Sequence, residues 1–520
     1  MLPTRGLWDA IERRAVATPE ALFAVDEDER RLAFADYRDR VLRCAAGLHA
    51  RGVGEGTPVS WQLPTWLESM VLAGALARLG AVQNPILPIL REREVRFAVE
   101  KTGARLLAVP PAWRGFDHGA LADALARERP DLAVLRVDGP AGAHPLPEGD
   151  PAALPPAPPP PDPDDPARAP VRWVLFTSGT TGEPKGALHS DATVAAAGVA
   201  MAGVLDLRAD DRVALVFPLT HVGGINWLFA GLLVGCAHVV VAAFDPQESI
   251  AVLARHGVTQ ATAGTVFHQA YLAAQRRAGA GPLFPKVRAF PGGGAPKPPQ
   301  LHFEIKEAMG GAGIVSGYGM TECPIVVMNT VHDPDTKLAF TEGRPTPGME
   351  VRVVGPDGRA CGPDEEGEIR VRGPQLFRGY LDPAHDAGAF DAEGFFRTGD
   401  LGRLDREGYL VVTGRTKDVI IRKGENISAR EVEDHLHAHP AIAEVAVVGV
   451  PDPETGERAC AVVVPRDPAA PPDLETLGRF LVGRGLARQK VPERLVVETA
   501  LPRNPSGKVL RRELQARLTP

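Results

Sequence analysis

The 520-residue sequence is poor in cysteine, and the cysteines it has are dispersed. They are odd in number, and no two are spaced as C-x-x-C: Cys44, Cys236, Cys323, Cys361 and Cys460. This distribution disfavours both a disulfide framework and a zinc site. We therefore expect reduced thiols, as in a cytosolic protein.

A basic surplus and a long apolar run are also missing. The 58 Lys and Arg are outnumbered by 65 Asp and Glu, for a net charge of −7, which disfavours nucleic acid as a partner. No uncharged apolar stretch is long enough to span a bilayer. The opening residues, MLPTRGLWDAIERRA, lack the basic and apolar segments of a secretory signal. We expect a cytoplasmic globular protein without a transmembrane segment.

The N-terminal part alternates between two hydrophobic periodicities. LWDAIERRAVATP (7–19) and YRDRVLRCAAGLHARG (37–52) space their apolar residues as amphipathic helices, whereas VSWQL (59–63) and ARLLAV (104–109) are typical of short buried strands. Alternating helices and strands predict an α/β fold built on parallel sheets. The proline-rich segment 151–170 is expected to form an irregular surface connection.

The pattern changes in the last third of the chain. Residues 349–374 predict a β-rich hairpin with PDG as its turn. After residue 414 a compact α+β tail follows, with helices expected at 428–439 and 473–485 around two strands. We predict a large N-terminal domain, 1–416, made of parallel α/β subdomains and a β-rich subdomain, and a small mobile C-terminal domain, 417–520.

The chemistry-bearing motif is FTSGTTGEPKG at 176–186. Glycines turn backbone N–H groups toward an anion, and threonine and lysine add donors and charge, so the stretch predicts a phosphate cradle. It is not a Walker A loop, because Pro-Lys-Gly stands where that loop has Gly-Lys-Ser/Thr.

Further motifs follow this loop along the chain. They are PGGGAPKP (291–298), SGYGMTE (316–322), FRTGDLGRLDREGYL (396–410), GRTKDVIIRKGENIS (414–428) and NPSGKVLRREL (504–514). With this series, from about residue 10 to 515, the chain resembles the adenylate-forming (AMP-binding) superfamily of acyl-CoA synthetases, peptide-synthetase adenylation domains and beetle luciferases. Residues 61–95 are similar to short- and medium-chain and cyclohexanecarboxylate-type bacterial acyl-CoA ligases.

The resemblance implies a two-step reaction with ATP, Mg²⁺ and CoA. A carboxylate attacks the α-phosphorus of ATP to give an acyl-adenylate, and CoA then displaces AMP. No general base is required at first, because a carboxylic acid of pKa about 4 is ionised at pH 7. Positioning and electrostatics are therefore expected to carry most of the catalysis.

The resemblance also assigns roles to residues. Catalysis falls to Lys508, Thr321, Glu322 and His221, with Glu322 as the magnesium ligand. Nucleotide binding falls to Thr177, Ser178, Gly179, Thr180, Thr181, Lys185, Gly293, Gly294, Ala295, Pro296, Gly317, Tyr318, Gly319, Met320, Thr321, Asp400, Arg415 and Lys508. Lys423, Gly424 and Glu425 are expected to meet CoA, and Lys417 to be the hinge about which the C-terminal domain turns.

The acyl pocket is expected to use His221, Gly224, Ile225, Trp227, Phe267 and Gly292. The stretch TAGTVFHQ (262–269) departs from the family's proline-containing version, which puts the role of Phe267 in doubt. No Asp or Lys stands at these positions to pair with an amino group or a second carboxylate. A hydrophobic short- or medium-chain, alicyclic or aryl acid is therefore the expected substrate.

Other interpretations remain open. His435, His437 and His439 could suggest a metal cluster, but a solvated helix is favoured. The chain could instead load a separate carrier protein, since it contains no G-G-x-S carrier site of its own. A luciferase-type oxygenase and a non-catalytic nucleotide-binding relative are disfavoured, the latter because every motif residue is present.

Overall fold

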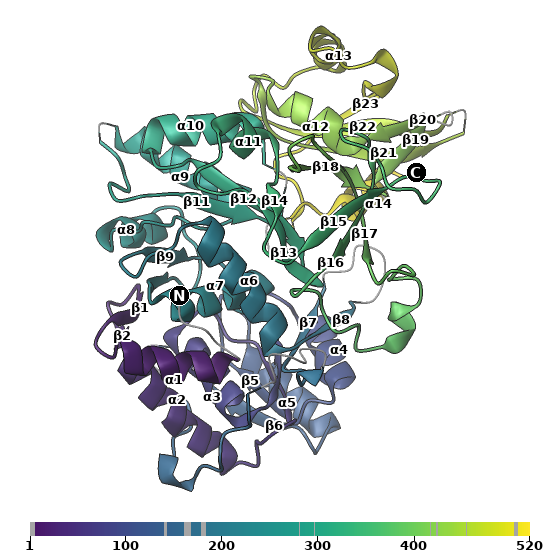
Figure 1. Cartoon of the computed structure of the whole chain (residues 1–520). Helices are drawn as coiled ribbons and strands as arrows, with labels where there is room; N and C mark the ends of the chain where they lie inside the picture. The colour runs from purple at the N-terminus through teal and green to yellow at the C-terminus, as the bar shows by residue number, and fades with distance from the viewer. Residues whose placement is uncertain are drawn as a thin grey trace.

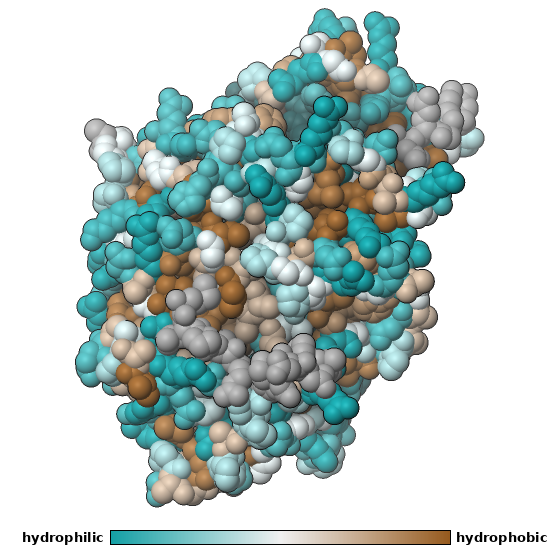
Figure 2. All heavy atoms as spheres, in the orientation of Figure 1, coloured by the Kyte–Doolittle hydropathy of each residue, from teal (hydrophilic) through white to brown (hydrophobic). Residues whose placement is uncertain are grey.

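A computed structural model describes residues 6–139, 143–160, 168–177, 184–279, 281–295, 297–416, 418–422, 425–453, 455–503 and 508–519, with the backbone alone at 425 and 426. Figure 1 shows the N-terminal elements in the lower part of the molecule and the C-terminal elements at its upper right. None of the described helices has the length and apolar character that crossing a bilayer requires. The face in Figure 2 is mainly hydrophilic, and its hydrophobic residues lie in separate patches.

The first sheet is parallel except at one edge. Its strand order is β6-β5-β3-β4-β7-β8, and only the last pair, β7 with β8, is antiparallel. This confirms the parallel α/β pattern expected from the alternating helices and strands. The bounds are β3 (Pro58–Trp61), β4 (Val82–Pro85), β5 (Leu106–Val109), β6 (Ala133–Arg136), β7 (Trp173–Phe176) and β8 (Gly186–His189).

Six helices accompany this first region, and α3, α4 and α5 each follow one of its strands in sequence. They are α1 (Leu7–Ala17), α2 (Phe34–His49), α3 (Leu67–Leu79), α4 (Glu92–Thr102), α5 (His118–Glu128) and α6 (Asp191–Val204). The proline-rich segment is irregular where it is described, except that it opens with a single 3₁₀ turn, η1 (Pro151–Ala153), which the sequence did not predict. That turn forms because Asp150 caps it, accepting a bond from the Ala152 N–H.

A second sheet region is built from two four-stranded sheets, β2-β1-β10-β9 and β11-β12-β13-β14. Gln260 joins them, because it bridges in parallel to Val213 on one side and to Ala289 on the other. The bounds are β1 (Leu22–Asp26), β2 (Arg31–Ala33), β9 (Arg212–Leu215), β10 (Ala237–Val240), β11 (Phe290–Gly293), β12 (Ile314–Met320), β13 (Cys323–Met328) and β14 (Arg344–Pro345). The helices of this region are α7 (Val222–Val234), α8 (Glu248–Arg255), α9 (Thr265–Ala278), α10 (Pro299–Met309) and α11 (Asp335–Phe340).

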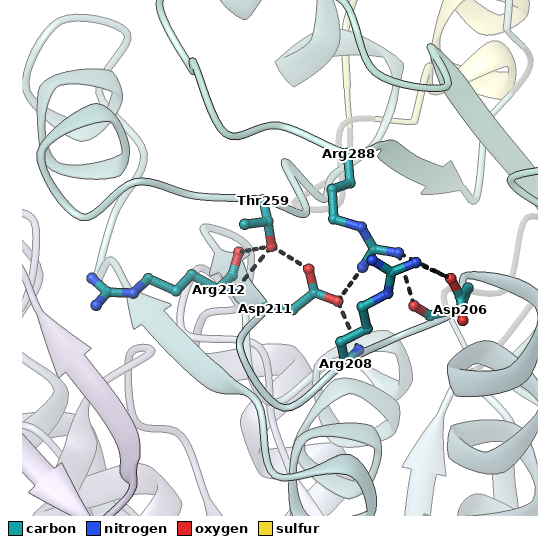
Figure 3. Close-up of polar contacts among 6 residues, drawn as sticks. All are labelled: Asp206, Arg208, Asp211, Arg212, Thr259 and Arg288. Carbon is teal, nitrogen blue, oxygen red and sulfur yellow. Dashed lines mark hydrogen bonds and ion pairs between the residues drawn. The ribbon is translucent and has the colours of Figure 1, made fainter.

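A polar network stabilises the junction between these two four-stranded sheets (Figure 3). The buried carboxylate of Asp211 accepts from Arg288 at 2.5 Å and from the Thr259 hydroxyl at 2.6 Å. Arg288 also reaches the Asp206 carbonyl at 3.0 Å, and Arg208 donates to the Asp206 carboxylate at 2.7 Å. The charge of Asp211 is thereby compensated, which lets the segments preceding β9 and β11 pack closely.

Helix α7 is a buried element that carries several of the residues expected to form the acyl pocket. It is apolar on nearly every face and packs against α1 and α6. His221 caps its first turn, accepting the Gly223 N–H at 3.1 Å. At the other end Arg14 donates to the carbonyls of Leu232 and Leu233 at 2.7 and 2.6 Å. A cation suits the negative end of the helix dipole, so both ends are anchored.

The β-rich subdomain is the four-stranded antiparallel sheet β15-β16-β17-β18. The hairpin expected at 349–374 is β15 with β16, but PDG is not the turn between them, because the connection runs from 355 to 366. Gly358, at φ 81°, donates to the Gly355 carbonyl and closes a local turn beside the Val354–Ala360 bridge. The bounds are β15 (Glu350–Val354), β16 (Gly367–Arg372), β17 (Phe396–Leu404) and β18 (Leu410–Arg415), with η3 (Pro383–Asp386) between β16 and β17.

The C-terminal region has its own sheet, β20-β19-β22-β21, with β23 beside β22. The change of sheet falls between Arg415, the end of β18, and Val419, the start of β19. The bounds are β19 (Val419–Arg422), β20 (Glu425–Ser428), β21 (Ile442–Asp452), β22 (Gly456–Pro465), β23 (Arg494–Val497), α12 (Ala429–His437), α13 (Leu474–Gly483), η4 (Arg488–Lys490) and α14 (Arg511–Leu518). The fold is therefore mixed α/β, with a large N-terminal and a small α+β C-terminal part.

Polar contacts join the two parts. Arg430 on α12 donates to the Glu342 carboxylate at 3.0 Å, and the Ser428 hydroxyl donates to the Thr413 carbonyl at 2.6 Å. The Asp434 carboxylate, one turn along α12, lies 3.8 Å from Arg430, and desolvation raises its pKa to about 6. These contacts stabilise one relative arrangement of the two parts.

Candidate active site

The site begins at the tip of the β12–β13 hairpin. Met320 pairs with Cys323, so Thr321 and Glu322 form a two-residue turn between the strands. Glycine is required at 319, because a Cβ there would lie 1.9 Å from the Pro324 carbonyl oxygen. The close approach of the two strands therefore projects the hydroxyl and the carboxylate from the end of a rigid hairpin.

A buried histidine contacts the backbone of the Thr321–Glu322 turn. His189, at the end of β8, lies 2.8 Å from the Thr321 carbonyl through its Nε2. A carbonyl can only accept, so the histidine carries a proton on that nitrogen. Burial lowers the pKa of His189 to about 4. A neutral imidazole thus fixes the backbone of Thr321.

Glu322 lies against Tyr380 and Lys185. The Tyr380 hydroxyl donates to Glu322 Oε1 at 2.7 Å, and Lys185 Nζ lies 4.8 Å from the centroid of the Tyr380 ring. Burial raises the pKa of the Glu322 carboxyl, while the Tyr380 bond and the Lys185 charge lower it. A partly desolvated carboxylate beside a lysine is suited to sharing a divalent cation with phosphate oxygens.

The ends of the glycine-rich loop are held together by the β7–β8 hairpin. The Thr177 N–H donates to the Lys185 carbonyl at 2.9 Å, and both residues line one large cavity. The predicted phosphate ligands between them lie outside the described residues: Ser178, Gly179, Thr180 and Thr181. Thr177 and Lys185 therefore mark where this loop meets the cavity.

The cavity has a volume of about 820 Å³ and joins the motifs that the sequence separates. Its lining includes Gly292, Gly293 and Gly294 from the glycine turn, and Gly317, Gly319, Met320, Thr321 and Glu322 from the hairpin. Gly293 has no room for a side chain, since a Cβ would lie 2.8 Å from the Gly317 carbonyl oxygen. Ala295 and Tyr318 are not among the lining residues, and Pro296 lies outside the described ones.

Asp400 is the centre of a polar group beside the hairpin. Tyr318 donates to its Oδ2 at 2.7 Å and Arg415 Nε lies 2.7 Å from its Oδ1. Asp400 and Arg415 are register partners on β17 and β18, and both line the cavity. Burial and the Asp400 charge raise the pKa of Tyr318, so its phenol remains the donor. Each carboxylate oxygen has a further lone pair with which to bind a ligand hydroxyl.

Lys508 lines the same cavity although it belongs to the C-terminal part. Burial, helped by the Arg415 charge, lowers its pKa to about 8. Three residues later, Arg511 is bound by the carboxylate of Glu433 on α12, at 2.7 Å. Glu433 in turn accepts the Val447 N–H at 2.6 Å, so the segment after Lys508 is fastened to the C-terminal sheet.

The residues expected in the acyl pocket fall at one end of the cavity, called the acyl end below, which is lined by Met201 and by residues within 217–227 and 262–267. His221, Trp227 and Phe267 lie in it as expected. Gly224 and Ile225 do not line the cavity: a Cβ on Gly224 would meet the Leu219 Cα at 2.6 Å, and Ile225 is buried in the core. Helical periodicity explains this, because their α7 neighbours Val222, Gly223 and Asn226 face the cavity instead.

Several lining residues had no signal in the sequence. Tyr380 and His385 lie in the β16–β17 connection, without a recognisable spacing. Arg397 belongs to the FRTGD motif on β17, but the sequence assigned no role to it. His189, which bonds the Thr321 carbonyl but does not line the cavity, is a buried residue of an ordinary strand. Only the tertiary contacts reveal these positions.

Some predicted positions are not described. Lys417, Lys423 and Gly424 lie outside the described residues, and of Glu425 only the backbone is described. The expectation of a solvated helix at the histidine cluster is wrong for His439, which is buried with its ring edge-on to Phe480 at 4.7 Å. No group of three potential metal ligands occurs among the described histidines, cysteines and carboxylates.

Comparisons with known proteins agree with this geometry. The family model for the AMP-binding enzyme matches residues 11–381, and that for the AMP-binding enzyme C-terminal domain matches residues 431–508. The chain is 33% identical over 535 residues to a medium-chain fatty-acid–CoA ligase of Escherichia coli, covering 99% of this chain and 92% of the relative. It is 35% identical to a salicyl-AMP ligase / salicyl-S-ArCP synthetase of Mycobacterium tuberculosis (96% and 88% covered) and 34% identical to a feruloyl-CoA synthase of Amycolatopsis (98% of each).

Solved structures are similar over nearly the whole chain. ATP-bound MatB from Rhodopseudomonas palustris superposes with a TM-score of 0.87 at 27% identity, covering 99% of both chains. The o-succinylbenzoate CoA synthetase MenE of Bacillus subtilis, in complex with ATP and a magnesium ion, gives a TM-score of 0.81 at 28% identity, covering 98% and 99%.

Proposed function

The chain belongs to the AMP-binding enzyme family, and from this premise we propose how its residues divide the work of the reaction. The enzyme is an ATP-dependent acid–thiol ligase, which forms an acyl-adenylate and then an acyl-CoA, releasing AMP and diphosphate. It uses ATP and CoA as co-substrates and Mg²⁺ as cofactor.

One observation supports the division of roles proposed here. A single cavity contains Lys185 and Glu322 from the N-terminal part and Lys508 from the C-terminal part. Adenylation joins two anions, the acid and the triphosphate, so its barrier falls when cations surround the α-phosphorus. Lys508 would bridge the attacking carboxylate and the α-phosphate, with Thr321 beside that phosphate.

The leaving diphosphate would be held at the glycine-rich loop. Thr177 and Lys185 line the cavity at the two ends of that loop, and Ser178, Gly179, Thr180 and Thr181 would complete the cradle. This arrangement differs from a Walker A loop in purpose, since the β- and γ-phosphates leave together. The loop must bind them during attack and release them afterwards.

Glu322 is the residue that would hold Mg²⁺. Its side chain is partly buried and lines the cavity, and its carboxylate accepts from the Tyr380 hydroxyl. Magnesium characteristically takes one or two protein carboxylates and completes its shell with phosphate oxygens and water, so a single carboxylate fits. When bound, the ion neutralises phosphate charge.

The nucleoside would be bound between the hairpin and β17. Asp400 is placed to accept the ribose hydroxyls and Arg415 to reach the ribose or a phosphate, since both line the cavity. The close-packed backbone of Gly293 and Gly317 would let adenine approach, with Gly294, Ala295, Pro296, Gly319 and Met320 around it. Tyr318 would stack on the base and also holds Asp400 by its hydrogen bond.

Thioester formation would follow a rotation of the C-terminal domain, 417–520, about Lys417. The change of sheet between Arg415 and Val419 supports a hinge here. Rotation would withdraw Lys508 and bring Lys423, Gly424 and Glu425 to the pantetheine arm of CoA. A crosslink that traps one orientation should abolish one half-reaction and spare the other; loss of both would contradict the hinge.

The acid would enter between α7 and the 262–267 segment. His221 lies at the N-terminal end of α7, and burial lowers its pKa, so it is neutral at pH 7. Trp227, Phe267 and Gly292 line the cavity with apolar surface. No Lys, Arg, Asp or Glu occurs in the described acyl end, which supports an acid with no second charge.

The test is a panel of short- and medium-chain, alicyclic and aryl acids. ATP–pyrophosphate exchange measures the first half-reaction, and chromatographic detection of acyl-CoA measures the second. We expect acid-dependent exchange and a CoA thioester. Exchange that stays at background with every acid would reject the proposed acid class.

Carrier-protein loading is the second candidate, because the salicyl-S-ArCP synthetase is as similar to this chain as the CoA ligases are. The same assay separates the two: acid-dependent exchange with no acyl-CoA, but acyl transfer to a supplied carrier protein, would favour the carrier.

We also propose a cytoplasmic location. All five cysteines are free thiols, and Cys44, Cys236, Cys323 and Cys460 are buried. Unpaired thiols are typical of reducing compartments.

A further inference from the structure

A buried lysine to which the proposed reaction gives no task lies shortly after the glycine turn. Lys297, between β11 and α10, is 7% exposed. Its Nζ donates to the Leu338 carbonyl and, at 3.1 Å, to the Ala339 carbonyl. Both carbonyls lie near the end of α11, where helix carbonyls have no partner within the helix. Lys297 therefore fixes the carbonyl end of α11 to the segment that carries the glycine turn.

The residues that follow α11 contact two other parts of the candidate site. The Thr341 carbonyl accepts from Asn329 Nδ2 at 2.9 Å and from the Ser316 hydroxyl at 3.3 Å. Ser316 lies on β12 and Asn329 directly follows β13, so both arms of the β12–β13 hairpin are bound here. The Glu342 N–H donates to the Leu410 carbonyl of β18 at 2.8 Å. The end of α11 is thus tied to the hairpin and to β18.

The side chain of Glu342 binds the C-terminal part. Its carboxylate accepts from Arg430 on α12 at 3.0 Å, and the two side chains are mostly buried, at 13% exposed for Glu342 and 16% for Arg430. Such a pair stabilises only in good geometry, because both charges have left water. The position of Glu342 depends on how α11 ends, and Lys297 fixes that end. A path of contacts therefore runs from the glycine turn through Lys297 and Glu342 to Arg430.

We propose that Lys297 is a positioning residue for adenylation: it sets Glu342 where Arg430 binds it, and so links occupancy of the glycine turn to the arrangement in which Lys508 lines the cavity. The inference rests on the proposed division of roles, in which adenine approaches the glycine turn and Lys508 arrives from the C-terminal part. Lys297 itself is buried and does not line the cavity, so it acts through the protein and not on a substrate.

The test compares Lys297→Met with a matched lysine at the other end of the same helix. Methionine is a similarly long side chain without a donor, and it tolerates burial. Lys306 Nζ donates to Asp335, at the start of α11, at 2.6 Å. Lys306→Met therefore removes a lysine contact to α11 and leaves its carbonyl end intact. If thermal denaturation shows that Lys297→Met does not fold, Lys297→Gln, with its shorter amide, takes its place.

The first readout separates the two half-reactions. Lys297→Met should slow ATP–pyrophosphate exchange about three- to tenfold, as mutations that weaken coupling between sites do. It should leave acyl-CoA formation from synthetic acyl-adenylate nearly unchanged. In a double variant with Arg430→Ala the two losses should not add, because both changes interrupt one path. Lys306→Met should keep both rates close to those of the wild type.

The second readout needs no turnover. Amide hydrogen–deuterium exchange, followed by mass spectrometry, measures the protection of α12 with and without ATP and Mg²⁺. ATP should increase that protection in the wild type and in Lys306→Met, because an occupied glycine turn favours the arrangement in which Arg430 binds Glu342. Lys297→Met should lose most of the increase.

Each other result decides the matter. Equal losses in both half-reactions, losses that add in the double variant, or equal effects of Lys297→Met and Lys306→Met would reject the positioning role and leave the ligase function intact. If ATP protects α12 through Lys297 but no acid supports exchange, the proposed function fails and the link stands. Protection that is absent from the wild type, or unchanged in Lys297→Met, rejects the link.

Discussion

Removing the Lys508 ammonium should separate the two half-reactions. Lys508 lines the cavity together with Lys185 and Glu322, and it enters from the C-terminal part. In an enclosed site, loss of one group that stabilises transition-state charge lowers kcat by about 10²–10³. Lys508→Ala should therefore slow adenylation by about that factor. Thioester formation from supplied acyl-adenylate should change only a few-fold, because the proposed rotation of the C-terminal domain withdraws the lysine before that step.

The pH dependence gives a second, independent measure. Burial and the Arg415 charge lower the pKa of Lys508 to about 8 in the ligand-free enzyme. Between pH 7 and pH 9 the charged fraction then falls from about nine-tenths to about one-tenth. Since the charged form is required, kcat/KM for ATP should fall as pH rises through 8. Bound triphosphate favours the charged form, so the fall in kcat should lie at higher pH.

The assay is ATP–pyrophosphate exchange for the first half-reaction and acyl-CoA formation from synthetic acyl-adenylate for the second. Lys508→Arg keeps the charge at all these pH values, so its alkaline fall should disappear even though its rate is lower. The exposed Arg512, on α14, supplies the control Arg512→Ala. Equal losses in both half-reactions, or a loss no larger than that of Arg512→Ala, would refute the assigned role.

Three further predictions follow from contacts around the site and the fold. Tyr380→Phe removes the hydrogen-bond donor to Glu322 and raises the pKa of that carboxyl further. The Mg²⁺ concentration needed for half-maximal exchange should therefore rise about three- to tenfold, and more at pH 6 than at pH 8. An unchanged Mg²⁺ titration would contradict this prediction. Arg430→Ala leaves the Glu342 carboxylate without its partner and should slow exchange several-fold while sparing the second half-reaction. Adding Glu342→Gln to that variant should restore part of the rate, because it removes the unpaired charge. If the losses of the two single variants simply add in the double variant, the two residues are not coupled. Asp211→Asn breaks the ion pair with Arg288 and should lower the free energy of unfolding by about 2 kcal/mol. The loss is smaller than for a fully buried pair, because the Arg288 side chain is partly exposed to solvent. Thermal denaturation measures it, and a midpoint equal to that of the wild type would count against the prediction.

Much of the fold was predictable because it follows local patterns. The strands expected at 59–63 and 104–109 are β3 (Pro58–Trp61) and β5 (Leu106–Val109), since buried parallel strands are short apolar runs between turn signals. The 3₁₀ turn at Pro151–Ala153 was missed, because a single capped turn leaves too short a pattern to separate from loop. The assignment of Gly224 and Ile225 to the cavity was wrong, because which face of a helix lines a cavity depends on the segments that pack against it.

The site was predictable where it consists of contiguous motifs. Thr321 and Glu322 could be identified because SGYGMTE, one of the motifs that carry the family resemblance, is a run of adjacent residues. Asp400 and Arg415 likewise belong to recognisable turns, although their direct pairing required the register of β17 with β18. The sequence by itself thus determined the family, the reaction class and most candidate residues, since each rests on neighbouring positions.

Only the tertiary structure decided the contacts between residues distant in the chain. Tyr380 is 58 positions from Glu322 and reaches it through a connection with no motif. Arg430 and Glu342 meet across the two parts of the molecule, 88 positions apart. Lys297 is an ordinary polar residue of its motif until its contact with the end of α11 is known. Such roles depend on distance and desolvation, and both arise only when separate segments pack together.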